Sequence, residues 1–103
     1  MLIYKGNTYK LPIKLKIREQ LIYADDVKAV EFSFGNIIKK YPDNVTFEGE
    51  TFIVPLTQDD TFSLDETSNT NYQARVFFND ESVKCTDQLK IDIRPSISKV
   101  VLK

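Results

Sequence analysis

The sequence predicts an all-β fold, a sandwich or barrel built from short strands. Three observations predict this class: about seven stretches in which apolar and polar residues alternate, turn-forming residues about every ten positions, and no stretch with convincing helical periodicity. The composition agrees, because 7 Phe and 5 Tyr stand against no Trp and a single Met, and aromatic residues favour strands. Residues 1–103 fit a single domain.

The clearest strand is predicted over residues 8–18, where the alternation is strict. One face carries Tyr9, Leu11, Ile13, Leu15 and Ile17, and the other carries Lys10, Pro12, Lys14, Lys16 and Arg18. Pro12 cannot donate a ladder hydrogen bond, so we expect this strand at a sheet edge or at a switch between sheets near Pro12.

Further strands are predicted at short intervals along the chain. They cover residues 27–35, 37–42, 44–47, 51–56, 71–79 and 82–94, with a hairpin turn at 79–82. Alternation along these strands predicts that one set of side chains is buried together between two sheets: Leu15, Phe32, Phe34, Tyr72, Val76 and Ile91. After Pro95 the segment 96–103 is an apolar tail, with Ile97, Val100, Val101 and Leu102.

The connection before residue 71 narrows the fold class to an immunoglobulin-like sandwich of about seven antiparallel strands. Thr57 and Asp60 have the spacing of a capping box, which predicts one helical turn after a strand. Tyr72 then precedes Ala74 by two positions, as in a tyrosine corner, whose hydroxyl bonds upstream backbone. We expect that bond within residues 57–68; the simpler interpretation is that Tyr72 is only a buried strand residue.

No disulfide is predicted, because Cys85 is the only cysteine. We interpret Cys85 as a small apolar filler beside Val83. The first ten residues, MLIYKGNTYK, lack an apolar stretch followed by a small-residue cleavage site, so we expect synthesis and folding in a reducing cytoplasm. No apolar run approaches the ~20 residues that span a bilayer, so no membrane partner is expected.

The sequence predicts no enzyme, no cofactor and no catalytic or metal-binding residue. The chain has no His, which removes the commonest acid–base group and zinc ligand. The neighbouring carboxylates are interpreted as turn formers, helix caps and solubilising charge: Asp25-Asp26, Asp59-Asp60 and Asp65-Glu66. The net charge is −1, and the basic face of residues 8–18 lacks interleaved aromatic residues, so no nucleic-acid partner is expected.

Five stretches carry a resemblance to a known group of proteins: YKGNTYKLPIKLKI, AVEFSFGNIIKKYP, VPLTQDDTFSL, NYQARVFFNDESV and SISKVVL. Together they resemble small structural proteins encoded in virion gene clusters of phages and prophages of Gram-positive bacteria. These are similar to the immunoglobulin-like domain that begins baseplate upper proteins. The resemblance implies a non-enzymatic virion protein, in the baseplate, the tail or associated with the head, whose partners are other virion proteins or further copies of itself.

Two questions stay open at this level. The alternative function is a carbohydrate-binding or host-surface-binding module, for which Tyr4, Tyr23 and Phe77 are the candidate exposed aromatics; sharing one surface would favour this function. The tail at 96–103 pairs either along an edge of its own sandwich or, by strand addition, with a neighbouring subunit.

Overall fold

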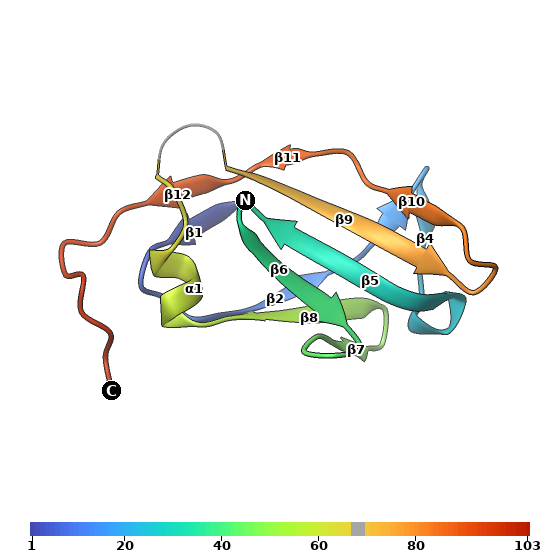
Figure 1. The fold of residues 1–103 in the computed structure, drawn as a ribbon, viewed down its shortest axis with the longest axis horizontal. Coiled ribbons are helices and arrows are strands. Elements are labelled where there is room, and N and C mark those ends of the chain that lie inside the picture. Colours follow the sequence, from blue (N-terminus) through green and yellow to red (C-terminus); the bar gives the residue numbers. More distant parts are fainter. Residues whose placement is uncertain (67–69) are drawn as a thin grey trace.

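The computed structural model describes residues 1–66 and 70–103, and there the protein is an all-β sandwich of two layers (Figure 1). The first layer is an antiparallel sheet in the order β2-β8-β7, formed by β2 (Tyr9–Ile13), β8 (Thr51–Leu56) and β7 (Thr46–Glu48). The second has the order β10-β9-β5-β6, formed by β10 (Val83–Cys85), β9 (Asn71–Phe78), β5 (Val27–Phe34) and β6 (Ile37–Tyr41). The predicted fold class is confirmed.

The strand order is that of an immunoglobulin-like domain. In such domains strands B, E and D share one sheet, strands C, F and G share the other, and variable-type domains add C′. Here β2, β8 and β7 stand in the places of B, E and D, while β6, β5, β9 and β10 stand in the places of C′, C, F and G. The sandwich has no disulfide, since its lone Cys85 is a free thiol.

One strand pair departs from the predicted antiparallel arrangement. β1 (Leu2–Tyr4) runs parallel to β12 (Asp92–Arg94), with Ile3 opposite Ile93. Parallel neighbours need a long connection between them, and almost the whole domain supplies it here. Turn signals report only local connections, so the sequence pattern did not reveal this pairing.

The strand predicted over residues 8–18 is interrupted after Ile13. Ile13 lies opposite Phe52 and β8 begins at Thr51, so Lys14 is the last residue of this stretch that could find a partner in β8. The chain turns instead into a separate hairpin formed by β3 (Lys16–Ile17) and β4 (Gln20–Leu21). β2 lies at the edge of its sheet, as Pro12 predicted.

The strand predicted over 82–94 is divided into three pieces: β10, β11 (Leu89–Lys90) and β12. Thr86 ends β10, because its N–H donates to the Ala74 carbonyl at 2.9 Å and its Oγ1 accepts from the Ala74 N–H at 3.0 Å. The interpretation of Cys85 as an apolar filler is wrong. Cys85 and Val83 are both exposed, since Cys85 lies opposite Arg75 on the outer face of the sheet.

The core lies between the two layers where the sequence predicted it. All the predicted core residues are at most 5% exposed: Leu15, Phe32, Phe34, Tyr72, Val76 and Ile91. Phe32 of β5 meets Phe52 of β8 with ring centroids 5.6 Å apart, so aromatic packing joins the layers. Ala74 is fully buried in the position two residues after Tyr72.

The helical turn α1 (Gln58–Phe62) has the predicted capping box. Thr57 Oγ1 accepts from the Asp60 N–H at 3.1 Å, and Asp60 Oδ2 accepts from the Thr57 N–H at 2.8 Å. Asp60 also forms an ion pair of 2.8 Å with Lys39 of β6. Burial raises the pKa of Asp60, but the hydrogen bonds from Lys39 and Thr57 and the lysine charge outweigh burial, so the pKa lies below its ordinary value.

Candidate functional site

The outer face of the β10-β9-β5-β6 sheet carries a row of apolar side chains that crosses three strands. Val83 lies opposite Phe77, and Phe77 lies opposite Ala29, so the pairing register aligns the three residues. A bulge between Val27 and Ala29 sets this alignment. Val83 is 53% exposed and Phe77 is 36% exposed. The row therefore presents apolar surface to the outside of the sandwich.

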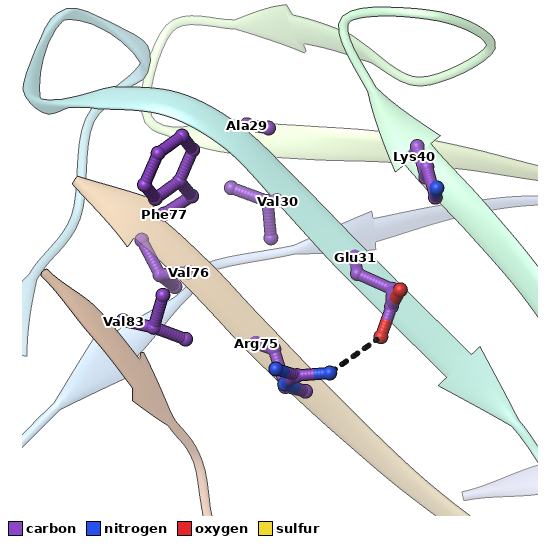
Figure 2. A pocket seen from close by; sticks show the side chains of 8 residues that line it. All are labelled: Ala29, Val30, Glu31, Lys40, Arg75, Val76, Phe77 and Val83. Carbon is purple, nitrogen blue, oxygen red and sulfur yellow. Dashed lines mark ion pairs between the residues drawn. The ribbon is translucent and has the colours of Figure 1, made fainter. Parts of the chain in front are cut away.

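A row of charged residues lies beside the apolar row. Arg75 lies opposite Glu31, and Glu31 lies opposite Lys40. The Arg75 and Glu31 side chains form an ion pair of 3.7 Å. Figure 2 shows this pair next to Phe77 and Val83, around a hollow of about 200 Å³.

The hollow is smaller than a typical small-molecule pocket. Its volume is below the ~300 Å³ at which ligand pockets typically begin. Its lining combines apolar side chains with the Arg75–Glu31 ion pair. Lys28 Nζ lies 5.6 Å from the centre of the Phe77 ring, so a cation borders the ring.

The apolar tail is the second exposed feature. The chain leaves the sandwich after β12 and runs along the α1 end of the molecule without forming a strand (Figure 1). Ile97, Val100 and Leu102 are 105%, 71% and 80% exposed. The first of the two alternatives for the tail, pairing as a strand along an edge of its own sandwich, is not observed.

One side chain of α1 holds the tail. The Gln58 side-chain amide donates from Nε2 to the Leu102 carbonyl at 2.8 Å, and its Oε1 accepts from the Leu102 N–H at 2.8 Å. Gln58 therefore binds the Leu102 backbone as a neighbouring strand would, through a single residue. Local sequence patterns carry no signal for this contact, because it joins positions 44 residues apart.

Tyr72 does not form the expected tyrosine corner with the part of the 57–68 connection that the structure describes. Its hydroxyl makes no hydrogen bond with residues 57–66, and residues 67–68 of the expected range lie outside the described residues. Its ring packs on Phe34 with centroids 5.1 Å apart. Burial raises the pKa of Tyr72 to about 12. The simpler interpretation, a buried strand residue, describes Tyr72 correctly.

The three candidate aromatics do not share one surface. Tyr4 lies on β1 and Tyr23 follows β4, and these strands lie towards opposite ends of the long axis (Figure 1). Tyr23 packs edge-on against Phe47 of β7, with ring centroids 6.3 Å apart. Phe77 belongs to the apolar row of the other layer. All three are exposed, but they are scattered.

Members of the carboxylate pairs have structural contacts. Asp26 accepts a hydrogen bond from the Tyr23 N–H at 3.0 Å in the short helix η1 (Ala24–Asp26), and Glu66 forms an ion pair of 3.8 Å with Lys5. Within residues 1–66 and 70–103 no three His, Cys, Asp or Glu side chains gather as metal ligands would. The same residues contain no helix long and apolar enough to cross a membrane.

The predicted basic face is divided by the break after Ile13. Lys10 lies on β2, whereas Lys16 and Arg18 belong to the β3–β4 hairpin. Lys14, between them, forms an ion pair of 3.6 Å with Glu50.

Comparison with known proteins adds no relative: no family model, no curated protein and no solved structure matches this chain.

Proposed function

We propose that the protein is a non-enzymatic structural component of a phage or prophage virion that acts through protein–protein assembly. It would be synthesised in the bacterial host cytoplasm and function in the particle. The observation that carries the proposal is the tail, in which Ile97, Val100 and Leu102 are exposed and whose described contact with α1 is the Gln58 amide pair. The virion setting is supported by the resemblance of the five sequence stretches.

The physical argument starts from the exposed apolar area of the tail. A segment that stays in solvent needs no apolar residues, whereas a segment that docks on a neighbour gains free energy from each side chain that it buries, at about 25 cal/mol per Å². Strand addition adds main-chain hydrogen bonds, and alternate side chains fix the register. Three uncovered side chains in one short segment are therefore typical of a docking element.

The test uses a bacterial host in which the phage or prophage copy of the gene is deleted. Variants of the gene are then supplied separately. In the test variant Ile97, Val100 and Leu102 are replaced by Ser; in the matched control Ser96, Ser98 and Lys99 are replaced by Ala. We expect the test variant to unfold with a free energy within about 0.5 kcal/mol of the wild type, since exposed residues contribute little. It should nevertheless be missing from purified particles, whereas the control should be incorporated.

Two results would count against this function. Normal incorporation of the serine variant would remove the tail as a docking element. A large loss of stability in the isolated domain would show that the tail supports its own sandwich. The carbohydrate-binding alternative is not carried further, because the scattered positions of Tyr4, Tyr23 and Phe77 do not make a stacking platform.

A further inference from the structure

Three strand edges of the sandwich have features that hinder the addition of another strand. On β6 the Asn44 side chain accepts a hydrogen bond from the Lys40 N–H at 2.9 Å. This N–H at the free edge is therefore not available to an added strand. On β1 the Tyr4 N–H donates to the Tyr9 hydroxyl at 2.9 Å. On β2 Pro12 supplies no N–H. Natural sheets commonly protect their edges by such means.

The edge formed by β10 lacks this protection. The Thr86 N–H donates to Ala74 at 2.9 Å, so the Thr86 backbone faces β9. Backbone groups alternate in direction along an antiparallel strand, so Lys84 faces β9 as well, and Val83 and Cys85 present their N–H and C=O groups outward. Among the described residues, no side chain or loop forms a hydrogen bond with these outward groups of Val83 and Cys85.

A basic groove runs along this open edge. It has a volume of about 500 Å³ and lies between residues 83–87 and the β3–β4 hairpin. Its charged lining is Lys16, Arg18, Lys84 and Asp87, three cations and one anion. Within the described residues none of the three cations forms an ion pair with a carboxylate.

From these observations we infer that β10 binds an extended acidic segment of a partner protein as an added strand. The outward groups of Val83 and Cys85 supply main-chain hydrogen bonds, as in other cases of strand addition. The three cations, none of which forms an ion pair with a carboxylate, favour a negatively charged segment. This inference does not rest on the proposed function, since it does not depend on the docking of the tail.

The charge of the groove also distinguishes this segment from the chain's own tail. Residues 96–103 carry two lysines and no acidic side chain. A second copy that docked its tail along β10 would bring like charges together, which is unfavourable. The tail therefore belongs to a different contact, and a synthetic tail peptide is a suitable negative probe.

The first experiment measures binding of three fluorescent peptides to the whole chain. One peptide of eight residues alternates threonine with glutamate, one alternates threonine with lysine, and one is the tail sequence 96–103. We expect the acidic peptide to bind at least tenfold more tightly than either other peptide, and its affinity to fall as salt is raised from 50 to 300 mM because salt screens the charges. Equal affinities for the three peptides would overturn the inference.

The second experiment asks whether the bound peptide forms a strand. Amide hydrogen exchange of the labelled protein is followed by NMR, with and without saturating acidic peptide. The Val83 and Cys85 amides should exchange at least tenfold more slowly in the complex, whereas the Thr86 amide, already bonded within the sheet, should change little. Unchanged exchange at Val83 and Cys85 would show that the peptide is held by charge alone and would refute strand addition.

Variants then locate the site. Lys16→Glu and Lys84→Glu should each weaken binding of the acidic peptide at least fivefold, while Lys10→Glu, a charge reversal on β2 outside the groove, should leave it within twofold. Cys85→Pro removes one outward N–H at an edge position where proline is tolerated, and it should weaken binding without altering the β-sheet circular dichroism. If Cys85→Pro fails to fold, the lysine variants and the hydrogen-exchange data decide whether the peptide binds along β10. If Lys10→Glu weakened binding as much as Lys16→Glu and Lys84→Glu do, this groove would be excluded as the binding site.

Discussion

The hydroxyl of Thr61 joins α1 to the turn between β1 and β2, so Thr61→Val is expected to weaken the fold. The side chain is fully buried although it is polar. Its Oγ1 accepts from the Gly6 N–H at 2.9 Å and donates to the Asn7 carbonyl at 2.8 Å. Valine has nearly the same shape, so this substitution removes the hydroxyl and leaves both backbone groups without their partner.

The expected magnitude follows from the two lost partners. A buried donor or acceptor left without a hydrogen bond costs about 1–3 kcal/mol. Both backbone groups are only partly buried, so water recovers some of this cost, and we expect a total loss of about 2 kcal/mol. That is a large share of the ~5–15 kcal/mol that stabilises a typical domain.

Urea unfolding followed by tyrosine fluorescence or circular dichroism measures this loss. Thr51→Val is the matched control, because Thr51 Oγ1 donates to the Glu48 carbonyl at 3.0 Å in an exposed turn, where water replaces the lost partner. The control should lose less than about 0.5 kcal/mol. If Thr61→Val lost no more than Thr51→Val, the Thr61 hydroxyl would not hold α1 in place.

Four further predictions follow from the same contacts. Phe32→Ala should cost about 3–5 kcal/mol in urea unfolding, since the side chain is fully buried, and a loss below about 1 kcal/mol would contradict its place in the core. Because the pKa of Asp60 is lowered in the fold, the wild type should exceed Asp60→Asn in free energy of unfolding by its largest amount above pH 5, and this difference should shrink as the pH falls below 3.8. A difference that is constant with pH would disprove the ion pair's role. Tyr72→Phe should lose less than about 0.5 kcal/mol at pH 7. Between pH 10 and about 12 the wild type should lose stability that Tyr72→Phe keeps, because the Tyr72 phenol ionises at lower pH in the unfolded chain than in the fold. An ultraviolet titration in which all tyrosines ionise near pH 10 would contradict this. Calorimetric melts with calcium and with a chelator should coincide, and a calcium-dependent rise of several degrees would reopen Asp59 and Asp60 as an ion site.

Much of the fold could be predicted because burial in a sandwich follows local sequence. Alternate residues of a strand face opposite sides, so Phe32, Phe34 and Val76 could be assigned to the core without knowing which strands pair. The capping box of Thr57 and Asp60 is also local, since its two hydrogen bonds join residues three positions apart. Each of these features depends on neighbours along the chain.

Strand ends could not be predicted in the same way, because they depend on the partner strand. The alternation of residues 8–18 continues through the break after Ile13, so the sequence gives no sign that β8 begins only at Thr51. Thr86 similarly ends β10 through hydrogen bonds to Ala74, which is 12 residues away. Alternation identifies the face of a residue but not the length of its ladder.

The candidate site escaped prediction for a related reason. Cys85 was interpreted as a small apolar filler beside Val83, but both residues lie on the outer face of the sheet, which is exposed. The row from Val83 through Phe77 to Ala29 exists only when three strands are aligned, and a bulge in β5 contributes to that alignment. Phe77 alone gave a signal, as an apolar residue on the polar face of its strand.

The places of the tail and of β10 constrain how this protein could assemble. The tail leaves the sandwich at the end near α1, whereas β10 lies towards the other end of a molecule 46 Å long (Figure 1). The basic groove runs beside β10. A contact between two different surfaces is heterologous, and repeated heterologous contacts form rings or filaments rather than closed pairs. Under the proposed function, a tail that docks on a neighbouring copy therefore favours a ring or a stacked array. Because the basic groove rejects the basic tail on grounds of charge, each subunit in such an array would keep β10 available for a separate acidic partner.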